Sequence, residues 1–213
     1  MNLSCYIDHT LLKSFATEEE LTKLCNEAKK YLFKSVCVNP CDVAFCKKQL
    51  EGSGVLVCTV IGFPLGKNKT EIKVEETRLA LIDGADEFDM VINVAKLKQG
   101  NLIYVEDEIK AVMSACGNKT VKVIIETGLL TDEEIATATK IVCNAGAGFV
   151  KTCTGFTGGV ATENAVKIMK QNLSGKTLIK ASGGVKTYEQ AVNFINLGVS
   201  RIGTSSGVEI VNG

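Results

Sequence analysis

Two lysines stand out because each follows apolar residues and precedes small residues and glycine. Lys151 lies in Phe149–Gly155, and Lys180 lies in Leu178–Gly184. A lysine in a buried strand is costly unless it is paired or neutral. Burial and a second nearby cation both lower the pKa of an amine, and a neutral amine is a nucleophile. One such lysine is typical of a side chain that reaches solvent from a strand end, but two in successive similar segments indicate an amine nucleophile with a neighbouring cation.

Carboxylates that can pair with these lysines also occur in apolar, strand-like segments. Asp89 and Asp8 are the two candidates. A carboxylate buried in a strand needs a partner, and a lysine of a neighbouring strand can supply it. The alternatives are a purely structural ion pair for Asp89 and a cap of the adjacent turn for Asp8. Glu126 and Cys37 have simpler interpretations, as the closure of a strand end and as a small core residue.

Glycine and hydroxyl residues gather in three later segments. Their members are Thr154, Gly155, Gly183, Gly184, Ser205 and Ser206. Backbone N–H groups in such turns bind phosphate, especially beside helix N-termini. A single Gly-Gly pair can be no more than a tight turn, but two such loops near the end of the chain favour a phosphate site.

These residues need a scaffold that brings the ends of strands together. Eight strand-like segments alternate with helical ones, at residues 6–10, 35–38, 55–61, 87–93, 122–126, 148–152, 177–180 and 201–203. Many are continuously apolar, which is typical of parallel strands covered on both faces. Capping boxes, in which a threonine precedes Glu or Gln by three positions, predict helix starts at Thr17, Thr131 and Thr187.

Eight such units can form either a closed (βα)8 barrel or an open doubly wound sheet. An open dinucleotide-binding sheet would carry Gly-x-Gly-x-x-Gly after its first strand, and residues 6–10 are not followed by that motif. The sequence therefore predicts an α/β fold, a (βα)8 TIM barrel, as one domain over residues 1–213. In such a barrel catalytic groups lie at the carboxyl ends of the strands, and phosphate sites often follow strands seven and eight.

The composition limits the classes of function. The 213 residues are 46% hydrophobic and carry 24 basic and 24 acidic side chains, which indicates a soluble protein with no footprint for nucleic acid or an acidic membrane. Residues 1–10 lack the apolar run of a signal peptide. Nine cysteines without C-x-x-C spacing indicate reduced, buried thiols in a cytoplasmic protein. A single histidine and the lack of ligand spacing predict no metal site.

Eight segments, in order along almost the whole chain, resemble those of the deoxyribose-phosphate aldolases, a family of class I aldolases. They are residues 7–13, 35–40, 59–66, 89–93, 122–127, 149–152, 180–185 and 201–206. The resemblance implies a TIM barrel that needs no metal or organic cofactor. It also implies reversible cleavage of 2-deoxy-D-ribose 5-phosphate to acetaldehyde and D-glyceraldehyde 3-phosphate, a reaction of deoxyribonucleoside catabolism.

The same resemblance assigns roles to the candidate residues. Lys151 would form the Schiff base, Lys180 would lie beside it, Asp89 would relay protons, and Asp8 would be an accessory acid-site group. The phosphate would lie against the glycine and hydroxyl residues named above. The implied partners are a phosphorylated sugar and acetaldehyde, with neither nucleic acid nor a membrane, and a homo-oligomer (dimer or tetramer) stays open.

Two features depart from the family pattern. Cys153 stands where a serine is usual, and the sequence ends at Gly213 without the C-terminal tyrosine that assists proton transfer in some relatives. Two other functions stay open. One is a different lysine-dependent barrel enzyme, because a fold does not fix a reaction. The other is a phosphate-binding regulatory barrel, whose signature would be loss of Lys151, Lys180 or Asp89, and all three are present.

Overall fold

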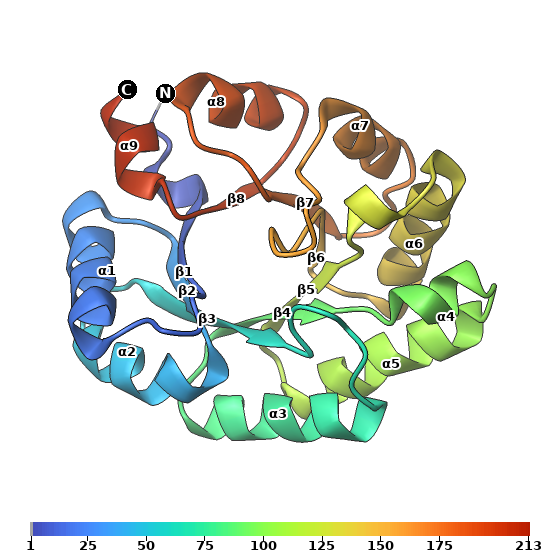
Figure 1. Cartoon of the computed structure of the whole chain (residues 1–213), viewed down its shortest axis with the longest axis horizontal. Coiled ribbons are helices and arrows are strands. Elements are labelled where there is room, and N and C mark those ends of the chain that lie inside the picture. The colour runs from blue at the N-terminus through green and yellow to red at the C-terminus, as the bar shows by residue number, and fades with distance from the viewer. Residues whose placement is uncertain (1) are drawn as a thin grey trace.

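The protein is an eight-stranded parallel barrel surrounded by helices. The computed structural model describes residues 2–213, and in it each strand pairs with the next and β8 pairs with β1. The strands are β1 (Ile7–Leu11), β2 (Ser35–Val38), β3 (Leu56–Ile61), β4 (Glu87–Val91), β5 (Thr120–Ile124), β6 (Phe149–Lys151), β7 (Leu178–Ser182) and β8 (Arg201–Thr204). Figure 1 looks along the barrel, with the helices forming a ring outside the strands. The predicted TIM barrel is confirmed.

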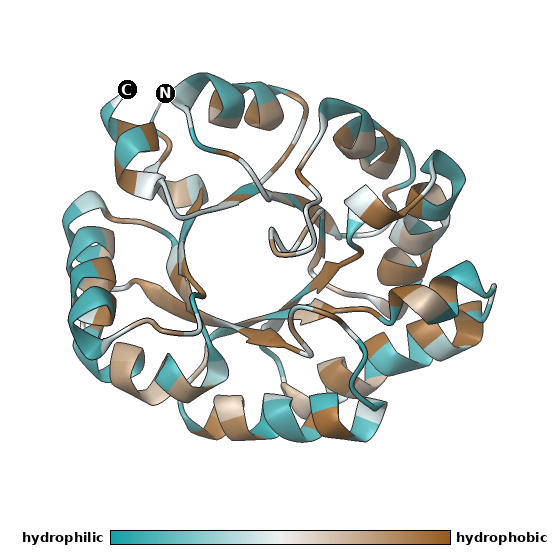
Figure 2. Cartoon of the chain, viewed as in Figure 1, coloured by the Kyte–Doolittle hydropathy of each residue, from teal (hydrophilic) through white to brown (hydrophobic). Residues whose placement is uncertain are grey.

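The helices follow the strands in alternation. They are α1 (Glu18–Tyr31), α2 (Val43–Gln49), α3 (Thr70–Ile82), α4 (Val94–Lys98), α5 (Leu102–Ala115), α6 (Asp132–Ala145), α7 (Glu163–Gln171), α8 (Tyr188–Asn196) and α9 (Gly207–Asn212). Thr17, Thr131 and Thr187 cap α1, α6 and α8 in complete capping boxes, so this prediction is confirmed. Hydrophobic and hydrophilic residues alternate along the helices (Figure 2), as expected where one face packs on the barrel.

Several strand ends differ from the predicted ones for local reasons. β4 ends at Val91 rather than at residue 93, because Asn93 caps α4 by accepting a hydrogen bond from the Lys96 backbone N–H. β5 covers 120–124 rather than 122–126. Glu126 lies past its end in a left-handed conformation, with φ of 58°, and such a residue cannot continue a strand.

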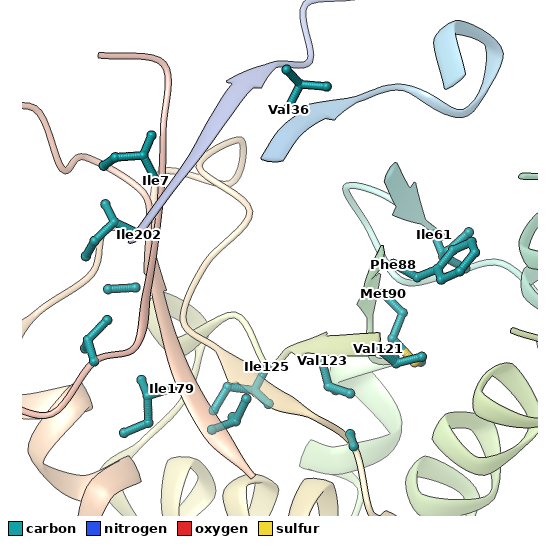
Figure 3. Close-up of a cluster of buried hydrophobic side chains, with 14 of the residues drawn as sticks. Ile7, Val36, Ile61, Phe88, Met90, Val121, Val123, Ile125, Ile179 and Ile202 are labelled. Atoms are coloured by element: carbon teal, nitrogen blue, oxygen red, sulfur yellow. The ribbon is translucent and has the colours of Figure 1, made fainter. Parts of the chain in front are cut away.

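The hydrophobic core lies between the strands and the helices. Successive side chains of a strand point to opposite faces, and every second residue packs outward into this core. Figure 3 shows outward side chains that include Phe88 and Met90 of β4, Val121 and Val123 of β5, Ile179 of β7 and Ile202 of β8. The residues between them face the barrel interior, and many of these are charged. The outer face of the strands is thus apolar, whereas the inner face combines these charged residues with a small apolar cluster on β2 and β3.

Two further predictions concern thiols and membranes. Within residues 2–213 the nine cysteines are free thiols, but Cys5 and Cys41 are exposed and Cys143 is half-buried, so the expected burial holds for the other six. The two exposed thiols lie outside the strands. Over the same residues, the helices include none that combines the length and apolar character needed to cross a membrane.

Candidate active site

Two lysine side chains converge on one carboxylate inside the barrel. Oδ2 of Asp89 accepts hydrogen bonds from Nζ of Lys151 and from Nζ of Lys180, each 2.7 Å away. The two lysines are register partners on β6 and β7, so their side chains leave adjacent strands on the same face. Asp89 and Lys180 are fully buried, and Lys151 is 4% exposed. The structure therefore brings together the three residues on which the sequence interpretation depends.

Asp8 belongs to the same cluster rather than to a turn. Its Oδ2 accepts a hydrogen bond from Lys180 Nζ at 2.5 Å, and its Oδ1 accepts hydrogen bonds from Arg201 and from the Ser35 hydroxyl, at 2.7 Å and 2.6 Å. The alternative of a turn cap is wrong. Gly203 makes this approach feasible, because a Cβ at that position would lie 3.0 Å from Cε of Lys180.

Four further residues of the cluster were missed in the sequence. Lys122 Nζ lies 2.9 Å from Oδ1 of Asp89 and 2.8 Å from Glu87 Oε2. Arg201 donates to both oxygens of Glu87 at 2.9 Å and 3.1 Å. The thiol of Cys58 donates to Oδ1 of Asp89 at 3.2 Å. We call the seven ionic residues the barrel charge cluster: Asp8, Glu87, Asp89, Lys122, Lys151, Lys180 and Arg201.

Glu87, Lys122 and Arg201 could have been found in the sequence as charged residues within apolar, strand-like segments. Catalytic groups of a barrel are expected at the carboxyl ends of its strands, whereas Glu87 and Arg201 are the first residues of β4 and β8. Both are charged residues that precede buried apolar ones in a strand, and Lys122 lies between two valines. A charge in an apolar strand needs a partner, and this holds for these three residues as it does for Lys151.

The carboxylates of the cluster are held ionised. Burial alone would raise the pKa of Asp89, but the charges of Lys122, Lys151 and Lys180 outweigh it and hold that pKa well below its usual range. Burial likewise opposes ionisation of Asp8, yet the nearby cations keep its pKa low. Since one carboxylate within a few ångströms favours an ammonium, each of these anions in turn stabilises the cations around it.

Lys180 and Lys122 are fixed cations. Burial would lower the pKa of Lys180, but Asp8 and Asp89 outweigh burial and raise it. The pKa of Lys122 is raised well above its usual value, against the effect of burial, chiefly by Asp89. Lys180 is therefore the charged neighbour of Lys151 rather than a second neutral amine. Lys151 differs from both, because its one carboxylate oxygen is already shared with Lys180.

A pocket of about 250 Å³ opens above the cluster. Of the predicted phosphate residues, five line it: Thr154, Gly155, Gly183, Gly184 and Ser205. Ser206 is not among the lining residues, and its backbone N–H donates to the Thr204 hydroxyl at 2.9 Å. Lys13, Lys186 and Phe156 also line the pocket, and the sequence interpretation did not include them. The pocket thus combines glycine loops and hydroxyl side chains with the cations Lys13 and Lys186.

The segment between β6 and α7 shapes the wall of this pocket. In Figure 1 it curls over the barrel opening, and the Ala161 backbone N–H donates to the carbonyl of Gly183 at 2.9 Å. Gly155 and Gly183 have φ of 82° and 95°, a region that favours glycine. A Cβ at Gly183 would lie 3.1 Å from Cβ of Cys153 and from the Gly159 carbonyl oxygen. The glycines therefore allow two loops to pack closely beside Lys151.

The carboxylate of Glu126 holds the start of this segment. Both of its oxygens lie 3.2 Å from the backbone N of Thr154, and its side chain is buried. This contact agrees with the interpretation of Glu126 as a residue that closes a strand end. Cys37 is buried with Leu12 and Val60 in a small apolar cluster, as the core interpretation predicted.

One group of side chains has the composition of a metal site. Ligand atoms of Cys37, Cys58 and Asp89 lie within 4.8 Å of one another. The oxygens of Asp89, however, already face the amino groups of three lysines at 2.7–2.9 Å, and Cys58 Sγ lies 3.2 Å from Lys122 Nζ. A divalent cation at this point would be repelled by the charged Lys122 and Lys180, so these residues do not fit a metal ion.

Comparisons with known proteins agree with this geometry. A family model described as DeoC/LacD family aldolase matches residues 3–212. A deoxyribose-phosphate aldolase of Finegoldia magna is 54% identical over 213 residues, and one of Treponema denticola is 52% identical over 215 residues, each alignment covering all of both chains. The tetrameric deoxyribose phosphate aldolase of Aeropyrum pernix superimposes with a TM-score of 0.88 at 33% identity, covering 99% of this chain and 89% of that one. The chain belongs to the DeoC/LacD family of aldolases.

Proposed function

We propose that the chain reversibly cleaves 2-deoxy-D-ribose 5-phosphate to acetaldehyde and D-glyceraldehyde 3-phosphate through a Schiff base on Lys151. One observation carries the proposal: of the seven residues in the barrel charge cluster, Lys151 is the one that also lines the pocket. It is thus the amine that a bound carbonyl can reach. The names of the two relatives above, which match over their full length, support the same substrate.

Two charged lysines lie beside Lys151. The ammonium of Lys180 lies on the same oxygen of Asp89, and Lys122 lies on the other oxygen. A like charge at such short range disfavours protonation, and burial adds to this effect. Lys122 and Lys180 each contact more than one carboxylate, whereas Lys151 contacts one and lines the pocket, so we assign the nucleophile to Lys151.

The covalent steps follow from that amine. Its lone pair attacks C1 of the open-chain sugar, and the carbonyl oxygen leaves as water, which gives an iminium ion. Removal of the proton from the C3 hydroxyl turns C3 into the aldehyde carbon of D-glyceraldehyde 3-phosphate, which leaves as the C2–C3 bond breaks. The electron pair of that bond forms the C1=C2 double bond of an enamine, and the iminium nitrogen becomes neutral. Protonation of C2 and hydrolysis then release acetaldehyde and regenerate Lys151. Asp89, linked to Lys180, would pass these protons through water, and Asp8 would hold Lys180 in place.

The other end of the pocket suits the phosphate. Backbone N–H groups of the glycine loops and the hydroxyl of Ser205 offer donors, and Lys13 and Lys186 offer positive charge beside them. A dianion is well held by such a set of donors and cations. We assign the phosphate to Gly155, Gly183, Gly184 and Ser205, with Thr154 in the same wall. Ser206 contributes by shaping the adjacent loop.

The wider role follows from the same substrate. We place the reaction in deoxyribonucleoside catabolism, carried out by a single aldolase domain over residues 1–213 in the cytoplasm, on small molecules rather than on nucleic acid or a membrane. The tetramer reported for the Aeropyrum pernix relative supports a homo-oligomer, and sedimentation of the purified chain distinguishes a dimer from a tetramer.

Reductive trapping tests the proposal directly. The protein is incubated with acetaldehyde and sodium borohydride and digested, and the masses of the peptides are then measured by mass spectrometry. An ethyl group on Lys151 is expected, together with release of D-glyceraldehyde 3-phosphate from deoxyribose phosphate in a coupled assay. A label on Lys151 without cleavage of deoxyribose phosphate would indicate an imine-forming enzyme with another substrate. Absence of any label on Lys151 would overturn the mechanism.

A further inference from the structure

Arg201 lies deep in the barrel and takes no part in the steps above. It is 6% exposed, and it donates to Oδ1 of Asp8 at 2.7 Å and to both oxygens of Glu87. Residues that line the pocket do not include Arg201 or Glu87, so neither can touch the substrate there. Two ionised groups buried this far from the reacting atoms would be costly to keep for packing alone.

A chain of short contacts connects Arg201 to the reactive amine. Arg201 holds one oxygen of Asp8, whose other oxygen holds Lys180 at 2.5 Å. Lys180 and Lys151 then meet on Oδ2 of Asp89, at 2.7 Å each. Arg201 is also the register partner of Lys180 on the adjacent strand, as Lys180 is of Lys151. The three cations therefore form one row across β6, β7 and β8.

The number of charges in the barrel charge cluster decides what this row does. The cluster holds four basic side chains (Lys122, Lys151, Lys180 and Arg201) and three carboxylates (Asp8, Glu87 and Asp89). With every group ionised the cluster carries one excess positive charge, and loss of one proton makes it neutral. Arginine does not lose its proton in proteins, and the contacts of Lys122 and Lys180 keep those amines charged. The excess charge is therefore removed at Lys151.

We infer that Arg201 is a positioning residue for the aldolase reaction, which acts through the charge of the buried cluster to keep the Lys151 amine unprotonated. The negative charge of its partner Glu87 offsets the positive charge of Arg201, and so sets the net charge of the barrel charge cluster. This inference rests on the proposed imine at Lys151. It makes the neutral nucleophile a property of the whole cluster, and not only of the two lysines that share Asp89.

The groups that face the cluster from each strand bear on its pH dependence. Besides the seven ionic residues on β1 and β4 to β8, these are the thiols of Cys37 on β2 and Cys58 on β3. Burial raises the pKa of Cys58, and the hydrogen bond from Cys58 lowers that of Cys37. Glu126 faces the end of β6, and Lys13 and Lys186 face the pocket. The variant Cys37→Ala therefore serves as a check that a thiol is not the group observed.

The test uses two substitutions of opposite charge. In Arg201→Met the ionised cluster is already neutral, so loss of a proton from Lys151 leaves an uncompensated negative charge. In Glu87→Gln the excess positive charge is doubled, so the proton leaves more readily. In a plot of kcat/KM against pH, the acid limb is the low-pH side on which activity falls, and it reports groups of the free enzyme. This limb should move to higher pH in Arg201→Met and to lower pH in Glu87→Gln, by about one pH unit each.

The double variant makes the prediction specific. Arg201→Met combined with Glu87→Gln restores one excess positive charge, so its acid limb should return to the wild-type position. Arg201→Lys keeps the charge but not the two-pronged contact with Glu87, and its limb should also stay in place. The matched surface variants Lys167→Met and Glu163→Gln change an exposed ion pair on α7, and their acid limbs should stay at the wild-type pH.

Each outcome separates the inference from the proposed function. Trapping on Lys151 in the wild type shows whether the imine exists at all, and circular dichroism melting identifies variants that do not fold. Suppose that the label is on Lys151 and that both single variants lose activity. If their acid limbs then do not move, or both move in the same direction, Arg201 has only a structural role. If Arg201→Met does not fold, Arg201→Lys with Glu87→Gln still tests the acid shift.

Discussion

The amino groups of Lys151 and Lys180 lie 2.7 Å from a single atom, Oδ2 of Asp89. One oxygen cannot fully compensate two positive charges at this distance, so the pair favours the loss of one proton. Lys180 has a second carboxylate, Asp8, at 2.5 Å, whereas Lys151 opens on the pocket. The two amines that share this oxygen thus have different surroundings.

Substitution of the two lysines should separate these tasks. Lys151→Ala should abolish borohydride trapping, because no other amine of the cluster lines the pocket. Lys180→Leu should still form an imine, but only at more alkaline pH, because the neighbouring charge that disfavours protonation of Lys151 is gone. The measurement is the mass of the trapped peptide across a pH series. A label on Lys180 in the wild type, or a label that persists in Lys151→Ala, would contradict the assignment.

Cleavage of deoxyribose phosphate should survive chelation. Three lysine amino groups, of which Lys122 and Lys180 are charged, surround the carboxylate that would have to bind a cation, and an imine can supply the electron withdrawal that a bound metal provides elsewhere. Activity is measured after dialysis against EDTA and again after addition of Zn²⁺, with a zinc-dependent aldolase as the control. Loss on dialysis and recovery with zinc would refute the Schiff-base mechanism.

The sequence predicted the parts of this site that repeat a pattern. Lys151 and Lys180 each stand in an apolar strand before a glycine, and capping threonines at Thr17 and Thr131 mark the starts of helices. Such features are local, and a barrel with strands in chain order places the strand ends together without further information. The fold and the central lysines could therefore be predicted.

The remaining features depend on long-range register. Arg201 meets Asp8 across 193 positions of the chain, and Lys122 meets Asp89 across 33. Which charges meet inside a closed barrel depends on the stagger of its strands, and one sequence alone does not state that stagger. The position of Lys186 in the pocket likewise depends on how the loop after β7 folds.

The pocket predicts a selective effect on phosphorylated substrate. Lys186→Met removes a cation and Ser205→Glu adds an anion at the assigned phosphate position, while the imine centre stays intact. Each should raise KM for deoxyribose phosphate at least about tenfold, the equivalent of about 1.4 kcal/mol, and change kcat/KM for unphosphorylated deoxyribose little. Lys176→Met, at an exposed lysine before β7, is the control. Equal losses on both substrates would show that the phosphate lies elsewhere.

A second buried ion pair predicts a large loss of stability. Lys73 of α3 is fully buried and lies 2.9 Å from Glu108 of α5. It also donates to the backbone carbonyls of Gly66 and Val91, at 3.0 Å and 2.8 Å, and so fixes the loop after β3. Lys73→Met would leave the carboxylate buried and unpaired, at a cost of about 3–5 kcal/mol in the free energy of unfolding.

The pair is best tested by a double-mutant cycle in urea. Glu108→Gln should be less costly than Lys73→Met, because an amide can still accept the Asn93 backbone N–H that bonds to Glu108 Oε2 at 3.0 Å. Combining Lys73→Met with Glu108→Gln should cost less than the sum of the two single changes. Strict additivity would show that the two charges do not interact in the folded state.

The barrel charge cluster predicts how stability depends on pH. Asp8 and Asp89 have pKa values in the folded state below their usual 3.8, so their contribution is present above about pH 4 and is lost as the pH falls. Lys122 and Lys180 have pKa values raised above their usual 10.5. Their contribution is present below about pH 10 and is lost as the pH rises through the folded-state values. The free energy of unfolding should therefore have a plateau between these limits.

Glu76 provides a control of opposite sign. Burial raises its pKa above the usual 4.5, so the folded state binds a proton more readily there and part of the acid loss is offset. Glu76→Gln removes that offset and should make the decline below about pH 5 steeper, whereas the exposed Glu189→Gln should change the slope little. Urea unfolding at closely spaced pH values measures each curve. A free energy of unfolding that rises on acidification from pH 5 to pH 3 would contradict the ionised state assigned to Asp8 and Asp89.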